Sequence, residues 1–198
     1  MRYYKEIYYF LHDEKYMQHD LFYLLYNIMK KEINKFYTDP EPGETEPYLI
    51  RRAKTIIDDY LKALDKPLYD HFIKIGLDCE VVLQRWLKCV FTREFHPIDA
   101  GKIWDVILAD NYNKKSSTFE YIDYFCVIMF IYIRDQLLEG DQNQCFTRLF
   151  KYLPLESILN LFSLVEQKRP YLTKVKTNLQ FRNINSKIVN QKLINNSI

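Results

Sequence analysis

The chain has 198 residues, 48 % hydrophobic and 27 % charged, which is about one domain with enough apolar material for a core. The 17 Tyr and 13 Phe against 4 Gly and 7 Pro exclude collagen-like and low-complexity chains and disfavour a many-turned all-β fold. A formal net charge of +2 gives no general reason to expect binding to nucleic acid or to an anionic membrane.

Apolar residues recur at spacings of three and four along most of the chain, which is the pattern of amphipathic helices. Residues 119–138 are apolar nearly all round, so this stretch is predicted to be the central helix. No alternating strand pattern accompanies them, and we predict an all-α fold, a compact bundle of seven or eight helices. The predicted helices cover residues 20–37, 48–64, 65–76, 78–91, 98–108, 119–138, 142–152 and 155–166.

Local signals set several helix ends. Asp65, which precedes Lys66 and Pro67, and Asp78 are N-cap residues for the helices that follow them, and Gly76 is typical of a helix C-terminus. Residues 38–47 contain three prolines and are predicted to form a surface loop.

Composition divides the chain into a lead-in segment (1–13), a helical subdomain (14–172) and a basic, Asn-rich tail (173–198). The tail holds five basic residues and no acidic one, which leaves 23 basic against 26 acidic residues before it. Such a terminus is predicted to be poorly ordered, with an arm that binds nucleic acid as the less favoured alternative.

No enzyme or metal site is visible in the residue pattern. The four His lie far apart, the four Gly stand alone, and the four Cys form no C-x-x-C pair, so we expect no metal and no cofactor. The Cys are typical of buried thiols in a reducing compartment. The longest apolar run, 121–133, is shorter than the ~20 residues of a membrane helix, and a cytoplasmic location is expected.

The most specific signal lies at residues 84–95 and continues into the next predicted helix. Trp86 falls on an apolar stripe and should point inward, and Trp104 shares a face with its apolar neighbours. We predict that the two indoles pack into one cluster, each burying about 200 Å². Arg93 and Glu94 stand at the helix junction and are predicted to tie helix ends together rather than to perform chemistry.

This segment resembles the hallmark of the C-terminal half of the TBC domain, the GTPase-activating domain for Rab proteins. Three further segments, 14–22, 65–72 and 131–135, are similar to family motifs in the same order, and the last is typical of the subgroup of TBC1 domain family member 5. The resemblance covers about residues 12–170. The residues that it marks, mainly for a structural role, are Arg85, Trp86, Phe91, Arg93, Glu94, Phe95, Trp104 and Asp105.

The resemblance also implies two catalytic residues in the family's N-terminal half, an Arg from I-x-x-D-x-x-R and a Gln from Y-x-Q. The Arg neutralises charge on the transferring γ-phosphoryl group and the Gln positions the attacking water. Gln18 and Lys62 fall in similar patterns, but in reversed order, and Lys lacks the planar fork of Arg. We interpret both matches as accidental and expect no catalytic residue in this chain.

Two functions are compatible with these patterns. The chain is either the C-terminal half of a Rab GTPase-activating protein whose catalytic residues lie on sequence not shown here, or a non-catalytic helical module that binds a Rab or a trafficking complex. Both imply a Rab-family GTPase as partner, no nucleic acid, and at most peripheral association with endomembranes. If helices 20–37 and 119–138 normally pack on a further part of the domain, the chain should expose apolar surface.

Overall fold

A computed structural model describes residues 2–11, 13–40, 42–114, 118–152 and 155–195, with side chains at 5–9, 13–40, 42–114, 118–152 and 155–181. These residues form helices and no β-strand, which confirms the predicted all-α fold. The elements are α1 (Arg2–Leu11), η1 (Glu14–Tyr16), α2 (Met17–Met29), η2 (Glu32–Phe36), α3 (Tyr48–Lys54), η3 (Thr55–Leu61), α4 (Lys62–Leu64), α5 (Lys66–Lys74), α6 (Cys79–Lys88), α7 (Pro97–Asn113), α8 (Glu120–Tyr132), α9 (Arg134–Glu139), α10 (Gln142–Phe150) and α11 (Ile158–Asn195).

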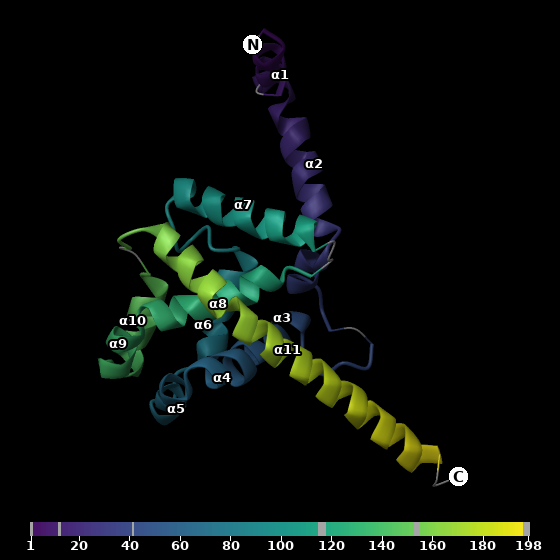
Figure 1. Cartoon of the computed structure of the whole chain (residues 1–198), viewed down its shortest axis with the longest axis vertical. Coiled ribbons are helices and arrows are strands. Elements are labelled where there is room, and N and C mark those ends of the chain that lie inside the picture. The colour runs from purple at the N-terminus through teal and green to yellow at the C-terminus, as the bar shows by residue number, and fades with distance from the viewer. Residues whose placement is uncertain (1, 12, 41, 115–117, 153–154, 196–198) are drawn as a thin grey trace.

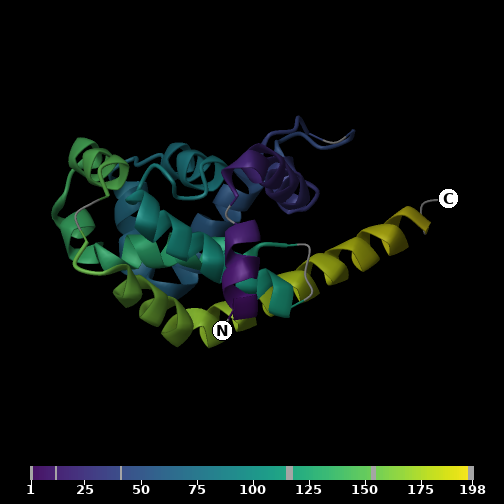
Figure 2. The same cartoon turned by 90° about the horizontal axis from the view of Figure 1, so that it is seen from above.

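Helix α8 is the centre of the core. From Tyr121 to Phe130 every residue except Asp123 is buried, and α8 packs on η3, α6, α7 and α11. Figures 1 and 2 show these helices arranged around it. The predicted central helix is therefore confirmed, but it does not run unbroken from 119 to 138. It ends at Tyr132, and Ile133, which lies outside helical geometry with φ −109° and ψ 22°, separates it from α9.

The helix predicted over residues 20–37 is also broken. After α2 the backbone extends at Lys31, with ψ −166°, and a separate 3₁₀ turn, η2, follows. The side chains of Ile33 and Phe36 in η2 are buried in the core, whereas none of those in α2 is buried. The chain must turn from solvent into the core at this point, and packing overrides the continuous helical pattern.

The predictions at α5 hold in detail. The Asp65 side chain accepts a hydrogen bond from the Leu68 N–H at 3.0 Å, and Gly76 takes the left-handed conformation with φ +65° after the last turn. The predicted helix 48–64 is helical throughout, although its middle third, η3, is wound as a π-helix. Helix α6 ends at Lys88 rather than 91, and α7 continues to Asn113 rather than 108.

Helix α11 is much longer than the predicted helix 155–166. It runs through Pro170 to Asn195, so the predicted domain boundary at residue 173 falls inside a helix. Before the proline, Val165 is buried and Arg169 forms an ion pair with Asp110 of α7. Beyond it, Leu172 is buried and Lys176 forms an ion pair with Glu120, so contacts with α8 hold the helix past the proline. The poor order of the tail stays a prediction, and residues 196–198 lie outside the described part.

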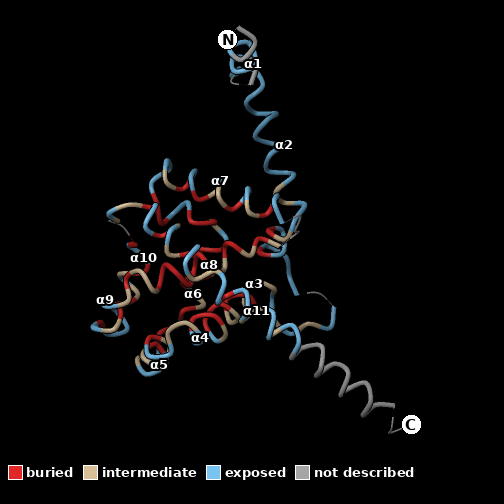
Figure 3. The backbone as a smooth tube through the Cα atoms, viewed as in Figure 1, coloured by how far each residue is buried: buried red, intermediate tan, exposed pale blue. Residues whose placement is uncertain are grey.

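Helices α1 and α2 project away from the body of the molecule (Figure 1), and Figure 3 shows residues 5–9 of α1 and most of α2 as exposed. The predicted exposure of apolar surface is thus found at α2, whereas α8 is enclosed by its neighbours. Across the residues that the structure describes, no helix is both long and apolar enough to span a membrane.

Candidate functional site

The corner between α6 and α7 contains most of the residues that the resemblance marks. Helix α6 ends in a Schellman motif, in which the Phe91 N–H donates to the Trp86 C=O at 3.1 Å and the Val90 N–H to the Leu87 C=O at 3.3 Å. The motif places Val90 at φ +40° and Phe91 at φ +66°, where glycine is usual. The burial of both side chains therefore holds a strained backbone in place.

Arg85 and Glu94 join the two sides of this corner. Arg85 Nε lies 2.7 Å from Glu94 Oε1, and the Glu94 side chain is fully buried while that of Arg85 is 21 % exposed. Arg85 Nη2 donates to the Arg93 C=O at 3.3 Å, and its guanidinium lies 5.2 Å from the centre of the Phe150 ring. The predicted tying role fits Glu94, but the Arg93 side chain is exposed and contributes only its backbone to these contacts.

Burial raises the pKa of the Glu94 carboxyl above its ordinary value, and the positive charge of Arg85 opposes this rise. Folding then favours the protonated form, so stability should fall as pH rises from about 4.3, the unfolded pKa, through the raised folded pKa. We expect the free energy of unfolding of the wild type, relative to Glu94→Gln, to decrease across this window in urea titrations.

Glu156→Gln, which removes an exposed carboxyl, is the matched control and should follow the wild type. A difference between wild type and Glu94→Gln that does not change with pH would contradict the assignment.

The two tryptophans support the corner in different ways. The Trp86 indole is fully buried and packs on Phe130 and Tyr152, with ring centres 5.0 and 5.9 Å away. Trp104 is only half-buried at the core surface, where its Nε1–H donates to the Val90 C=O at 3.0 Å. The inward position of Trp86 is confirmed, but the indoles do not stack on each other. Only the Trp104 indole binds the backbone of the turn that follows Trp86, through the Val90 carbonyl.

Of the remaining residues that the resemblance marks, the two phenylalanines are buried and Asp105 is exposed. The Phe91 ring lies 4.8 Å and the Phe95 ring 6.0 Å from the centre of Phe125 on α8. Asp105, like Arg93, is exposed. The corner is therefore an apolar anchor for α6 and α7 on α8, closed by one buried ion pair.

A second family segment, 65–72, also makes internal ties. Asp65 caps α5 and forms an ion pair with Arg134, which lies in the third family segment. The His71 Nε2 atom lies 3.1 Å from the Gly140 carbonyl oxygen. The family segments at 65–72 and 131–135 thus contact each other through the ion pair of Asp65 and Arg134.

A buried ionic cluster that no sequence motif indicated lies where α3, η2 and α8 meet. Arg52, whose side chain is 6 % exposed, donates from Nε to Asp123 Oδ1 at 2.5 Å and from Nη1 to Glu32 Oε2 at 2.8 Å. Its Nη2 donates to the Phe119 C=O at 2.7 Å. The Tyr48 hydroxyl donates to Glu32. We call Glu32, Tyr48, Arg52 and Asp123 the Arg52 cluster.

The Arg52 cluster fixes the base of α2 to the body, because Glu32 begins η2 directly after it. Burial raises the pKa of Asp123, while the charge of Arg52 opposes the rise. A pocket of about 310 Å³ opens over the cluster, with Lys176 and Gln180 of α11 on its other wall. Every charge in the cluster is paired, so its evident role is to join three elements.

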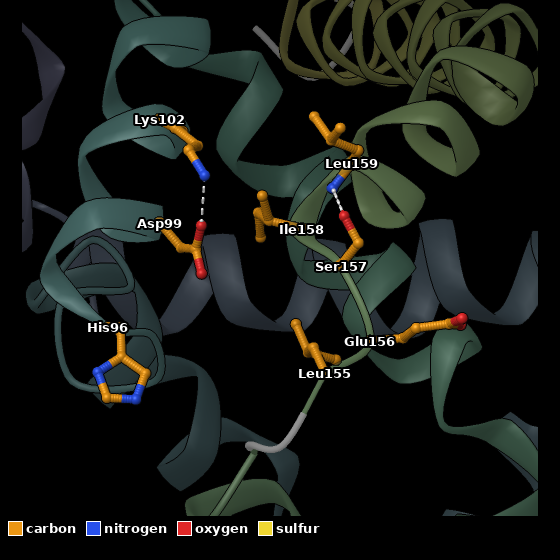
Figure 4. Close-up of a pocket in the computed structure, with 8 residues that line it drawn as sticks. All are labelled: His96, Asp99, Lys102, Leu155, Glu156, Ser157, Ile158 and Leu159. Carbon is orange, nitrogen blue, oxygen red and sulfur yellow. Dashed lines mark hydrogen bonds and ion pairs between the residues drawn. The ribbon is translucent and has the colours of Figure 1, made fainter.

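A larger pocket, of about 460 Å³, lies where the first turns of α7 and α11 meet (Figure 4). Lys102 pairs with Asp99 at 2.9 Å, and the Ser157 hydroxyl accepts the Leu159 N–H at 3.2 Å. These contacts engage Lys102, Asp99 and Ser157, and no interaction joins Ser157 to His96, so the lining shows no nucleophile paired with a base. Among the side chains that the structure describes, no three His, Cys, Asp or Glu are grouped to hold a metal ion.

Gln18 and Lys62, whose sequence matches we interpret as accidental, lie on different helices. Gln18 is exposed on the projecting helix α2. The Lys62 ammonium lies 5.0 Å from the centre of the Tyr69 ring, between the neighbouring helices α4 and α5.

Comparisons with known proteins agree with the fold and the corner. The sequence model of the Rab-GTPase-TBC domain matches residues 6–138. TBC1 domain family member 5 homolog B of Dictyostelium discoideum is 35 % identical over 113 residues, which are 57 % of this chain and 11 % of that protein. Human TBC1 domain family member 5 is 30 % identical over 104 residues, 52 % of this chain and 12 % of that protein. The chain thus spans about a tenth of these relatives.

Among solved structures, the Ypt/Rab-GAP domain of Gyp1p is similar, with a TM-score of 0.56 and 24 % identity. The likeness covers 64 % of this chain and 38 % of that domain's chain, and it shows a shared fold.

Proposed function

Since the chain belongs to the Rab-GTPase-TBC domain family, we propose that it forms the C-terminal part of a module that activates GTP hydrolysis by a Rab protein. The match of residues 6–138, which includes the whole α6–α7 corner, carries this proposal. The partner is a Rab-family GTPase, and the protein works in vesicle transport as a cytoplasmic protein, at most peripheral on endomembranes.

The residues of this chain serve such a module as scaffold. The corner and the Arg52 cluster fix α2, α6, α7 and α8 relative to one another, which sets the position of any Rab bound to them. The Arg and Gln that act on the γ-phosphate and the water come, in this proposal, from the family's N-terminal half. Positioned charge of this kind accelerates GTP hydrolysis by ~10³ to 10⁵.

The test measures single-turnover hydrolysis of GTP by a panel of Rab proteins. Residues 1–198 alone are expected to leave the intrinsic rate unchanged. The same residues joined after the N-terminal half of the Gyp1 domain should accelerate hydrolysis of at least one Rab. Changing the Arg of I-x-x-D-x-x-R to Lys in the joined protein should remove about 10³-fold of that acceleration.

A joined protein that binds a Rab without accelerating hydrolysis would favour the alternative, a non-catalytic module for a Rab or trafficking complex. Acceleration by residues 1–198 alone would contradict both proposals, because it would place a catalytic residue within the chain.

A further inference from the structure

A pocket of about 240 Å³ lies between α5 and the start of α6, at the opposite end of α6 from the corner. Its apolar lining consists mainly of buried side chains, those of Ile57, Phe72, Leu77 and Cys79. Ile73 also lines the pocket, but 63 % of its surface is exposed. The pocket therefore has an apolar floor and an aliphatic side chain that stays open to solvent. We call it the α5–α6 pocket.

Three carboxylates line the same pocket, those of Asp58, Asp78 and Glu80. The cation in the described lining is Lys54, whose Nζ pairs with Glu46 at 2.5 Å. Burial raises the pKa of the Glu80 carboxyl, and the neighbouring carboxylates raise it further against the opposing charge of Lys54. The pocket thus carries negative charge that Lys54 does not neutralise.

Helix capping explains only part of this charge. The Asp78 side chain accepts a hydrogen bond from the Glu80 N–H at 3.1 Å, which is the N-cap interaction of α6. Asp58 comes from η3 and is exposed, and the Tyr69 hydroxyl donates to its Oδ1 at 3.2 Å. Two separate elements therefore bring carboxylates to one apolar pocket.

The size of the α5–α6 pocket and the placement of its charges identify the kind of ligand that fits. Sites for small molecules usually enclose ~300 to 1,000 Å³, which is more than this pocket holds. Among the side chains that the structure describes, these carboxylates are not grouped closely enough to hold a metal ion. A cavity of about 150 Å³ already admits benzene, so the α5–α6 pocket has room for an aliphatic side chain of another protein segment.

We propose that the α5–α6 pocket binds a basic segment of a partner protein. The segment inserts an aliphatic side chain between Phe72 and Ile73 and places Lys or Arg beside the carboxylates of Asp58 and Glu80. Complementary charge selects such a segment over an acidic one, and the apolar floor selects it over a basic segment without an aliphatic residue. Figure 1 shows α5 on the far side of the body from α2 and α7. The inference does not depend on the proposed function.

Fluorescence anisotropy tests the proposal with residues 1–198 and a labelled peptide in which arginine and leucine alternate. We expect saturable binding that weakens as the salt concentration increases, because salt screens the exposed charges. A peptide with glutamate in place of arginine and one with serine in place of leucine should each bind about tenfold or more weakly. Peptide binding is measured without a Rab, so its outcome is distinguishable from that of the GTP hydrolysis test.

The double variant Asp58→Asn and Glu80→Gln removes two of the carboxylates and keeps the size of both side chains. It should weaken binding of the arginine–leucine peptide by about tenfold or more. Asp70→Asn is the matched control, because Asp70 is an exposed acid on α5 that pairs with Lys66 outside the pocket. It should leave the affinity unchanged.

Ile73→Ser tests the apolar contact and is also expected to weaken binding by about tenfold. Its control is Phe22→Ser on α2, which removes an apolar side chain that is 70 % exposed and should leave the affinity unchanged. These substitutions all lie at the surface, and circular dichroism verifies that each variant keeps its helices.

Three results would overturn the proposal. The first is the absence of saturable binding. The second is equal weakening by the double variant and by Asp70→Asn, or by Ile73→Ser and Phe22→Ser, which would place the peptide elsewhere on the chain. The third is equally tight binding of the serine peptide, which would show a general attraction between charges and no use of the apolar floor.

Sedimentation distinguishes another occupant, the basic end of α11 from a second copy of the chain. Residues 173–195 hold five basic residues and no acidic one, so they have the charge that the pocket selects. Self-association that the double variant Asp58→Asn and Glu80→Gln removes would assign the pocket to a second copy and would overturn the proposal. A chain that sediments as a monomer and binds the peptide supports it.

Discussion

Trp86→Ala is expected to lower the free energy of unfolding by about 3–5 kcal/mol, because it removes a large, fully buried side chain from the centre of the fold. The indole fills the space between Phe130 of α8 and Tyr152, and both of these are themselves enclosed and unable to collapse fully into the cavity. Urea or thermal denaturation followed by circular dichroism measures the loss.

Trp86→Phe tests whether the loss of stability follows the volume that is removed, because phenylalanine keeps an aromatic ring in the core. The indole Nε1–H has no hydrogen-bond partner among the described residues, so phenylalanine removes an unsatisfied donor as well as part of the ring. Its cost should therefore be well below that of alanine. Tyr112→Ala, at a side chain that is 82 % exposed, is the surface control and should change stability by less than about 0.5 kcal/mol. Equal losses for Trp86→Ala and Tyr112→Ala would contradict the burial.

The sequence predicted helix ends well where the hydrogen bonds that set them lie between residues close together in the chain. The caps at Asp65 and Asp78 and the left-handed Gly76 depend on hydrogen bonds within three residues or so, which a residue pattern contains. The end of the helix predicted over residues 78–91 was placed too late, since α6 ends at Lys88. Its Schellman geometry was missed because Val90 and Phe91 take positive φ angles where glycine is the usual signal.

The other failures share one cause, contact between distant parts of the chain. Pro170 indicates a helix end, yet burial of Leu172 and the ion pair between Lys176 and Glu120 continue α11 past it. The Arg52 cluster joins residues 71 positions apart. Its one sequence signal was Asp123, a charge in the first turn of an otherwise apolar helix, which requires a buried partner but does not identify it. The sequence also did not predict that Trp86 is fully buried and Trp104 only half-buried. Periodicity shows which face of a helix points inward, but not how far a side chain on that face is buried.

Arg52→Ala is expected to cost about 3–5 kcal/mol, as large a loss as that for Trp86. The substitution leaves the buried carboxylate of Asp123 without its cation and the Phe119 carbonyl without its donor. It also releases Glu32, so amides of η2 should exchange faster than those of α8. Denaturant titration and hydrogen exchange of the same variant measure both effects.

Arg51→Ala is a matched control at the adjacent residue. Arg51 is 41 % exposed and pairs with Glu44 at the surface, so its loss should cost no more than about 1 kcal/mol. The pH dependence gives a second, independent check. Burial already raises the pKa of Asp123, and removing Arg52 removes the charge that opposes this rise. An acid with a raised folded pKa destabilises the fold once it ionises, so the gap between wild type and Arg52→Ala should widen as pH increases from the acid range. Similar losses for both arginines, or a gap that narrows as pH increases, would show that the Arg52 cluster does not hold these elements together.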